Sequence, residues 1–261
     1  MSPADQPDVA TTRVVAFDLD DTLAESKATM APEMVQALQD LLAVVPVCII
    51  SGGRMEQFEG QVLAHLDRPE LFDRLHLMPT CGTRYYRWQD DAWTQVYAHD
   101  LTAEEKADAV AALEDGAAAL GLWSDADEVW GDRIEDRGSQ ITLSALGQQA
   151  PVAAKKAWDP SGEKREKLRA FVSERLPSLE VRSGGSTSID ITARGIDKAF
   201  GIDKLCGILS ITPEQVHFVG DRLEPGGNDH PVLSLGVSAF AVEGPEETLS
   251  HVRAFVAAAS A

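Results

Sequence analysis

The sequence predicts an α/β protein in which a doubly wound parallel sheet is split by an inserted α+β domain. Three observations support this fold class. Early in the chain, short and continuously apolar runs alternate with amphipathic helical stretches. The middle of the chain has a pattern typical of antiparallel strands, and the first pattern returns near the end. We therefore expect two core segments, residues 1–84 and 194–261, around an inserted domain at residues 85–193.

The first core segment contains three predicted strands and two predicted helices. The strands are expected at residues 13–18, 45–50 and 75–78, where apolar residues follow one another without alternation. Pro32 suits the first turn of the helix between the first two strands. A second helix is expected at residues 55–66, where apolar residues recur at helical spacing.

The inserted domain begins with a predicted hairpin at residues 85–97, whose aromatic residues at 85–88 either face a cleft or pack the hairpin against a helix. Thr102 and Glu105 match a capping box, which predicts a helix running to about residue 120. The other expected elements are strands at residues 129–134, 140–145, 179–182 and 187–192, and a helix between residues 159 and 177.

The second core segment returns to the parallel pattern. Helices are expected at residues 197–209 and 246–259, and strands at residues 216–220 and 235–240. In a doubly wound sheet, ligands bind at the carboxyl ends of the strands, so this is the edge at which functional side chains are expected.

Composition excludes several classes of partner. With 23 Lys and Arg against 42 Asp and Glu, the formal net charge is −19, which disfavours nucleic acids and anionic membrane surfaces. We see no apolar run long enough to span a bilayer and no signal peptide in residues 1–5. Three sparse cysteines, at positions 48, 81 and 206, suggest reduced thiols, so a cytoplasmic location is expected.

Two acidic residues follow the first predicted strand, in the sequence FDLDDTL at residues 17–23. Asp18 and Asp20 are expected side by side at the strand's carboxyl edge, where their repulsion would be relieved by a divalent cation. One can attack as a nucleophile, and the other can protonate a leaving oxygen and then activate water. The alternative is an acidic cluster that caps a helix.

Two further motifs supply groups that suit a phosphate. Ser51 and Gly52 follow the second predicted strand, where a hydroxyl and loop amides could bind phosphoryl oxygens, although a simple capped turn is the alternative. Lys198 begins a predicted helix. Its ammonium could neutralise a transferring group near the two carboxylates, or it could be an ordinary exposed helix lysine.

The fourth motif is GDRLEPGGND at residues 220–229. Asp221 ends a buried strand, and a glycine-rich loop then returns with Asn228 and Asp229. Oxygen ligands of this kind suit Mg²⁺, whereas an acidic turn without a metal is the alternative.

In this order, the four motifs resemble the signature motifs of the haloacid dehalogenase superfamily, the aspartyl-phosphate phosphohydrolases. The insertion between the second and third motifs resembles subclass IIB, whose α+β cap occurs in sugar phosphatases and eukaryotic-type phosphomannomutases. Residues 220–230, together with SID at 188–190 and DK at 197–198, look most like phosphomannomutase. The resemblance covers nearly the whole chain and implies a Rossmann-like core.

The resemblance implies a role for each matching core residue. Asp18 corresponds to the nucleophile and Asp20 to the acid/base. Phosphate would be bound by Ser51, Gly52 and Lys198. Mg²⁺, the implied cofactor, would be held by Asp18, Asp20 and Asp221, with Asn228 and Asp229 in support.

In the cap, Arg137, Ser188 and Asp190 match the substrate-binding pattern of phosphomannomutases, although Arg137 and Asp190 could instead form a surface ion pair. The second expected arginine is Gln148, and the third falls near Lys155 or Lys156. The arginine expected after the first motif is also missing, with Lys27 the nearest cation. These differences weaken the binding of a second phosphate and therefore disfavour a mutase.

We therefore expect a Mg²⁺-dependent phosphatase that hydrolyses a small phosphorylated metabolite, with a sugar phosphate as the expected class, through an aspartyl-phosphate at Asp18. The alternative is a phosphomannomutase that interconverts mannose 1-phosphate and mannose 6-phosphate. A binding or regulatory protein with a decayed core is a third hypothesis, which the presence of all four motifs disfavours. The resemblance also implies a homodimer formed through the caps.

Overall fold

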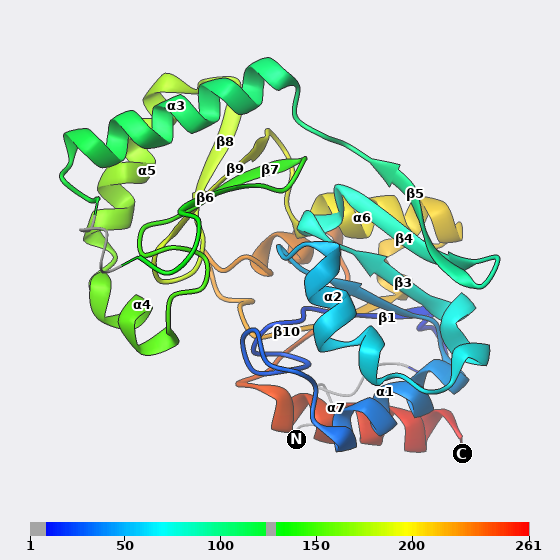
Figure 1. Ribbon diagram of the computed structural model, residues 1–261. Coiled ribbons are helices and arrows are strands. Elements are labelled where there is room, and N and C mark those ends of the chain that lie inside the picture. Colours follow the sequence, from blue (N-terminus) through cyan, green and yellow to red (C-terminus); the bar gives the residue numbers. More distant parts are fainter. Residues whose placement is uncertain (1–8, 124–128, 261) are drawn as a thin grey trace. The chain divides into compact units, whose positions relative to one another are not determined.

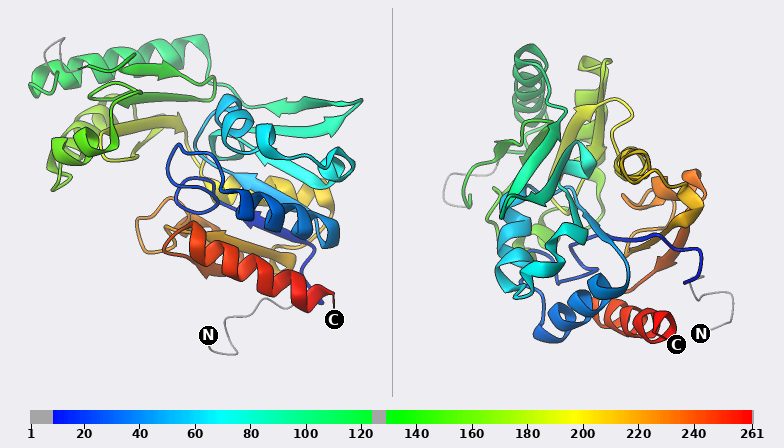
Figure 2. Two further views of the ribbon diagram at one scale, coloured as in Figure 1. Left: turned by 60° about the horizontal axis from the view of Figure 1, so that its bottom comes forward. Right: turned by 90° about the vertical axis from the view of Figure 1, so that its right-hand side faces the viewer.

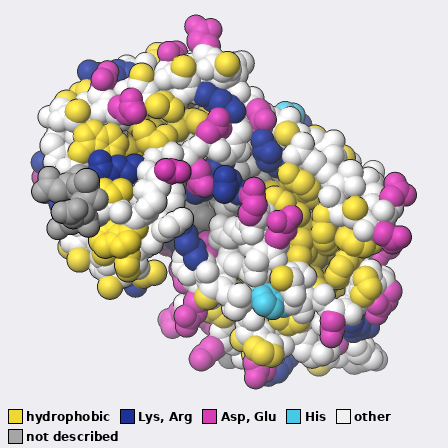
Figure 3. All heavy atoms as spheres, in the orientation of Figure 1, with side chains coloured by type: hydrophobic (Ala, Val, Ile, Leu, Met, Phe, Trp, Pro, Cys, Tyr) yellow, Lys and Arg dark blue, Asp and Glu magenta, His cyan; other side chains and the backbone are white. Residues whose placement is uncertain are grey.

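The computed structural model describes residues 9–123 and 129–260, so the expectation for residues 1–5 lies outside the described residues. The chain divides into two compact units, one formed by Met1–Ala98 with Asp197–Ala261 and the other by His99–Ile196. Within the described ranges, we find no helix with the length and apolarity needed to cross a membrane. Acidic side chains are spread over the visible face of both units (Figure 3), as expected for the strongly negative net charge.

The core unit is built on a seven-stranded sheet with the order β11-β10-β1-β2-β3-β4-β5 (Figure 1). The neighbouring strands from β11 to β3 are parallel, which confirms the predicted α/β core. The bounds of these five strands are Val14–Phe17 (β1), Val47–Ile50 (β2), Leu75–Met78 (β3), Val216–Gly220 (β10) and Ser238–Ala241 (β11).

Helices cover both faces of this sheet (Figure 2). Val15 and Phe17 of β1 pack in one apolar cluster with residues of α1, α2 and α7, whereas Val14 and Ala16 pack in another with α6. Because β1 is buried on both faces, it is apolar throughout. The helices are α1 (Pro32–Val44), α2 (Met55–Gln61), α6 (Lys198–Leu209) and α7 (Pro245–Ala259), and the short 3₁₀ helices are Leu63–His65, Pro69–Arg74, Thr80–Gly82, Pro213–Gln215 and His230–Leu235.

The hairpin of β4 (Arg84–Gln89) and β5 (Ala92–Ala98) corrects the expected domain boundary. The sequence pattern predicts residues 85–97 as part of the inserted domain, but β4 pairs antiparallel with β3 and so extends the core sheet. The hairpin satisfies backbone groups that β3 would otherwise leave unpaired at the edge of the sheet. Its aromatic residues pack within this unit: the Tyr85 hydroxyl is 2.7 Å from His76 Nδ1, and the Trp88 ring lies edge-on to Phe72.

The second unit contains an antiparallel sheet with the order β6-β7-β9-β8. Alternation places Ile141 and Ile189 in its apolar cluster with residues of α3 and α5, while Thr142 and Asp190 lie on the opposite, polar face. The bounds are Ala103–Ala119 (α3), Ile134–Asp136 (β6), Gln140–Ser144 (β7), Val152–Trp158 (α4), Glu163–Arg175 (α5), Leu179–Ser183 (β8) and Ser188–Ala193 (β9).

Some predicted bounds are wrong by several residues. The strand expected at 129–134 is β6, which begins only at Ile134, because the preceding residues bond to the loop after β7 through contacts such as Trp130 N–H to Leu146 O. The strand expected at 235–240 begins at Ser238, after a 3₁₀ helix that ends at Leu235 and is followed by Gly236 at a φ of 85°. The helix expected at 55–66 is divided into α2 and a 3₁₀ turn.

Candidate active site

Three parallel strands deliver polar residues to one edge of the core sheet. Asp18 follows β1, Asp221 follows β10 and Ser51 follows β2. Because β10, β1 and β2 are adjacent, their carboxyl ends meet. The Asp18 peptide N–H donates to Val219 O at 3.0 Å, which fixes the start of the first motif against the neighbouring strand.

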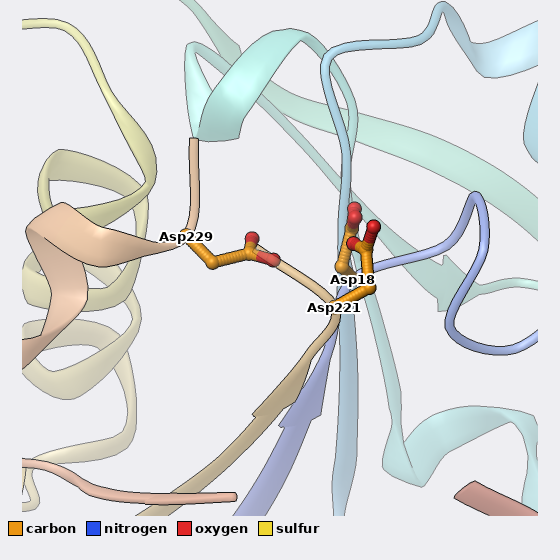
Figure 4. Close-up of side chains that lie close together, drawn as sticks. All are labelled: Asp18, Asp221 and Asp229. Atoms are coloured by element: carbon orange, nitrogen blue, oxygen red, sulfur yellow. The ribbon is translucent and has the colours of Figure 1, made fainter. Parts of the chain in front are cut away.

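The carboxylates of Asp18, Asp221 and Asp229 form a compact cluster. Each contributes an oxygen, and these oxygens all lie within 4.8 Å of one another. In Figure 4, the side chains of Asp18 and Asp221 lie alongside each other at the strand ends, and Asp229 points towards them from the returning loop. Two of the expected metal ligands are therefore together, and Asp229, expected only in support, joins them.

Lys198 supplies the cation of this cluster. Its side chain is fully buried, and Nζ lies 2.5 Å from both Asp18 Oδ1 and Asp229 Oδ1. The residue begins α6, and Asp197 caps that helix by accepting a hydrogen bond from the Phe200 peptide N–H at 3.1 Å. Lys198 is therefore a buried member of the site and not an exposed helix lysine.

The charges of the cluster do not balance, since one ammonium faces three carboxylates. Burial raises the pKa of Asp18, and the nearby Asp229 adds to that rise, although the Lys198 ammonium opposes it. Burial and Asp229 likewise raise the pKa of Asp221. A divalent cation would offset this excess of negative charge, and carboxylate oxygens are the donors that Mg²⁺ prefers, so the residues present fit that ion.

The glycine-rich loop after β10 holds Asp229 in place. The Arg222 peptide N–H donates to Asp229 Oδ2 at 3.1 Å, and the Asp229 N–H donates back to Arg222 O at 3.2 Å. A Cβ at Gly220 would lie 2.5 Å from Asp229 Oδ2, so the close approach requires glycine there. Asn228 is exposed, in contrast to the buried Asp229.

Asp20 is not a member of the group of three carboxylates whose oxygens lie within 4.8 Å of one another. Its Oδ1 accepts a hydrogen bond from the Lys27 peptide N–H at 2.7 Å, and its Oδ2 accepts one from Gln57 Nε2 at 2.8 Å. The expectation that Asp18 and Asp20 lie side by side took strand alternation beyond the end of β1. In the structure, β1 ends at Phe17 and the chain turns, since Leu19 O accepts hydrogen bonds from three later peptide N–H groups.

Ser51 and Gly52 occupy the predicted loop between β2 and α2. Ser51 is buried, its Oγ accepts a hydrogen bond from the Gly53 peptide N–H at 3.2 Å, and its carbonyl accepts one from Cys81 at 2.9 Å. A Cβ at Gly52 would lie 3.9 Å from Cys81 Sγ, an ordinary contact distance. Hydrogen bonds from the Gly53 and Cys81 peptide N–H groups thus hold this loop in place. Its binding of phosphate stays a prediction.

The substrate residues predicted in the second unit belong to its polar sheet face. Asp190 Oδ1 accepts hydrogen bonds from Thr142 Oγ1 at 2.8 Å and from Gln140 Nε2 at 3.0 Å. Arg137 Nε donates to Glu135 Oε2 at 2.7 Å. Burial raises the pKa of Asp190, while the positive charge of Arg137 lowers it. Ser188, in contrast, bonds through its carbonyl to the Gly184 peptide N–H at 2.9 Å.

The positions that replace the expected arginines contact one another. Gln148 Nε2 donates to Thr142 O at 3.4 Å, and Lys155 Nζ donates to Gln148 O at 3.0 Å. Lys156 is exposed. Lys27 contacts the site through its peptide N–H, which donates to Asp20.

Sequence reasoning missed three groups that the structure brings to these clusters. Thr22 Oγ1 lies 3.5 Å from Asp221 Oδ1, and its position within the first motif was a signal that could have been followed. Glu135 lies two positions before Arg137, so an ion pair between these opposite charges could have been proposed from the sequence. Gln57, in contrast, gives no sequence signal for its contact with Asp20, thirty-seven positions away.

The profile of the haloacid dehalogenase-like hydrolases matches residues 15–259. The chain therefore belongs to this family of phosphoryl-transfer enzymes, in which Mg²⁺ is the typical cofactor. This match spans both core segments and the insertion.

Proteins similar in sequence include a probable phosphomannomutase of Caenorhabditis elegans, 28% identical over 92% of this chain and 93% of its own length. Human phosphomannomutase 1 is 25% identical over 91% of this chain and 89% of its own length. Among solved structures, an IMP-nucleotidase of Plasmodium falciparum has a TM-score of 0.70 at 14% identity, covering 94% of this chain and 68% of that chain. A trehalose-6-phosphate phosphatase related protein has a TM-score of 0.59 at 14% identity, covering 95% and 98%. The structural likenesses concern the fold.

Proposed function

We propose that this protein is a Mg²⁺-dependent phosphatase that hydrolyses a small phosphorylated metabolite, with sugar phosphates as the substrate class. The observation that carries the proposal is the buried Lys198 ammonium, 2.5 Å from Asp18 Oδ1, beside the clustered carboxylates of Asp221 and Asp229. A nucleophile, a fixed cation and an oxygen-rich cation site are the parts that transfer of a dianionic phosphoryl group requires.

In the first step, Asp18 attacks phosphorus and forms an aspartyl-phosphate, while the departing alkoxide takes a proton from Asp20. In the second step, Asp20 accepts a proton from water and the resulting hydroxide attacks phosphorus. The bond between phosphorus and Asp18 breaks, which releases inorganic phosphate and regenerates the Asp18 carboxylate. Lys198 holds Asp18 in place and neutralises negative charge on the transferring group. Ser51 and Gly52 bind its other oxygens.

Asp18 and Asp221 are the residues that would hold Mg²⁺, with Asp229 beside them. We retain Asp20 and Asn228 as lesser contributors, since the Asp20 carboxylate is engaged elsewhere and Asn228 is exposed. When bound, the ion would screen the repulsion between the carboxylates and the incoming phosphate.

Substrate selection is assigned to Arg137, Ser188 and Asp190 of the inserted unit. The Asp190 carboxylate faces neutral donors, which suits sugar hydroxyls. The Arg137 guanidinium is paired with Glu135, so a second phosphate would compete with a carboxylate for it. A cytoplasmic location and a dimer formed through the inserted unit remain part of this proposal.

A phosphomannomutase is the second candidate, because similar proteins of that name match over nearly the whole chain. A mutase must retain a bisphosphorylated intermediate while it turns, and that requires strong binding of two phosphates. Gln148 stands where the phosphomannomutase pattern expects an arginine, which favours the phosphatase.

The test is a screen of phosphorylated metabolites with Mg²⁺, scored for released phosphate and repeated with EDTA. We expect metal-dependent release from one or more sugar phosphates. In parallel, mannose 1-phosphate with a sugar bisphosphate activator is followed for conversion to mannose 6-phosphate. Interconversion faster than phosphate release would favour the mutase. No metal-dependent reaction in either assay, including with p-nitrophenyl phosphate, would support a protein without catalysis.

A further inference from the structure

The carboxylate of Asp20 is held by donors from two separate segments. The Lys27 peptide N–H, on the loop before α1, donates to Oδ1 at 2.7 Å. Gln57 Nε2, on α2, donates to Oδ2 at 2.8 Å. The amide of Gln61, one turn further along α2, lies 3.4 Å from Oδ1. Both carboxylate oxygens are therefore held, Oδ1 by the Lys27 peptide N–H with the more distant Gln61 amide, and Oδ2 by the Gln57 amide.

The backbone around Asp20 is already rigid, so its side-chain torsions are the freedom that remains. Leu19 is fully buried, and its carbonyl accepts hydrogen bonds from the peptide N–H groups of Leu23 at 3.0 Å and Ala24 at 3.2 Å. The Lys27 N–H anchors one carboxylate oxygen but leaves the plane of the carboxylate free to rotate. The Gln57 amide is the contact that fixes the second oxygen.

Gln57 is itself seated on the loop after β2. A Cβ at Gly53 would lie 2.0 Å from Gln57 Oε1, so the amide occupies space that only a glycine leaves open. The Gly53 peptide N–H also donates to Ser51 Oγ. Gln57 thus links the orientation of Asp20 to the loop that carries Ser51.

We propose that Gln57 is a positioning residue that orients the Asp20 carboxylate for proton transfer to the leaving oxygen. This inference rests on the proposed function, in which Asp20 is the acid. A carboxylate has about four lone-pair sites, so the bonds from Gln57 and Lys27 leave sites for the transferred proton. Loss of the Gln57 amide lets the carboxylate rotate, which weakens acid assistance without removing the nucleophile.

The experiment compares Gln57→Met with the unmodified protein on two aryl esters. Methionine has a similar length and lacks the amide donor. Phenyl phosphate has a poor leaving group that needs a proton, whereas p-nitrophenyl phosphate has a good one that does not. Their kcat/KM values report the step in which the leaving group departs. Gln36→Met is the matched control, because Gln36 also donates to a carboxylate, Asp40, at 2.9 Å on the exposed face of α1.

We expect Gln57→Met to lower kcat/KM at least ~10-fold for phenyl phosphate and less than ~3-fold for p-nitrophenyl phosphate, as partial loss of general acid catalysis requires. KM should change little, and Gln36→Met should leave both esters unaffected. Gln57→Lys, which restores an N–H donor, should recover part of the phenyl phosphate activity. Thermal unfolding of each variant measures its folded fraction.

Two results would overturn the inference alone: equal losses on the two esters, or a gain on phenyl phosphate, which would make Gln57 a restraint on Asp20. If Gln57→Met does not fold, the same comparison is made with Gln57→Asn, whose amide is too short to reach Asp20. If the unmodified protein releases phosphate from neither ester nor from any metabolite, the proposed function fails and this inference fails with it.

Discussion

Each unit holds an aspartate at its candidate site, but the two units compensate the charge of that aspartate in different ways. In the core, Asp18 faces a fully buried ammonium and two further carboxylates. In the inserted unit, Asp190 faces a hydroxyl and an amide, and Arg137, whose charge lowers the Asp190 pKa, pairs with Glu135. The first arrangement concentrates unbalanced charge, which suits covalent chemistry on an anion. The second gives a carboxylate directional hydrogen bonds from uncharged donors, which suits recognition of uncharged hydroxyls.

Asp18→Asn tests the core side of this comparison and has the largest expected effect. Asparagine preserves the shape of the side chain but cannot attack phosphorus, so turnover of every phosphate ester should fall by at least ~10⁴-fold. The measurement is phosphate release from p-nitrophenyl phosphate and from the best metabolite of the screen. Asp108→Asn, on an exposed position of α3, is the control. Unchanged turnover would exclude Asp18 as the nucleophile.

Lys198→Met tests how far the core depends on its buried cation. Without the ammonium, Asp18 and Asp229 are buried carboxylates with no cation between them, so the free energy of unfolding should fall by about 3–5 kcal/mol. Guanidinium denaturation followed by tryptophan fluorescence measures this change. Lys204→Met, on an exposed position of the same helix, should alter stability by less than ~0.5 kcal/mol. Equal effects of the two variants would show that the Lys198 contacts contribute little.

Asp190→Asn tests the inserted unit, where a smaller and substrate-dependent effect is expected. The Asn Oδ1 can still accept hydrogen bonds from Thr142 and Gln140, so the fold should persist. Loss of a charged acceptor for a hydroxyl should raise KM about 10-fold for a sugar phosphate, with p-nitrophenyl phosphate unaffected. Asp136→Asn, at the exposed last residue of β6, is the control. An equal rise in KM for both substrates would show that Asp190 does not determine substrate specificity.

The part of the core site that lies at the ends of parallel strands could be predicted from the sequence, whereas the contacts of Asp20 could not. Asp18, Ser51 and Asp221 each end an apolar run, and parallel strands bring their carboxyl ends together, so the core site followed from chain order and one rule of topology. The orientation of Asp20 did not follow. It depends on a turn after β1 and on an amide of α2, neither of which has a periodic signature.

The domain boundary was mispredicted for a related reason. The pattern at residues 85–97 correctly indicated a hairpin, but a hairpin's own sequence does not specify which sheet it joins. Pairing with β3 is set by the open edge that the parallel strands leave, a property of the assembled core. The substrate residues stay predictions, because their assignment rests on resemblance and not on a contact in the structure.

A buried histidine of the core unit, His76, gives the smallest expected effect, a change in how the free energy of unfolding depends on pH. Burial and the charge of Arg87 lower the pKa of His76, on β3, to about 4. The unfolded chain therefore binds more protons than the folded one between pH 6.5 and about 4, so stability falls as pH falls through that window.

His76→Gln removes this proton uptake, whereas the other titrating groups, including His217, are present in both proteins, so their contributions cancel. Between pH 7 and pH 6, the unmodified protein should lose roughly 0.7 kcal/mol more unfolding free energy than the variant, and roughly 1.2 kcal/mol more between pH 6 and pH 5. Denaturation at several pH values measures this difference, and a stability difference that stays constant from pH 7 to pH 5 would mean that His76 titrates equally in the folded and unfolded states.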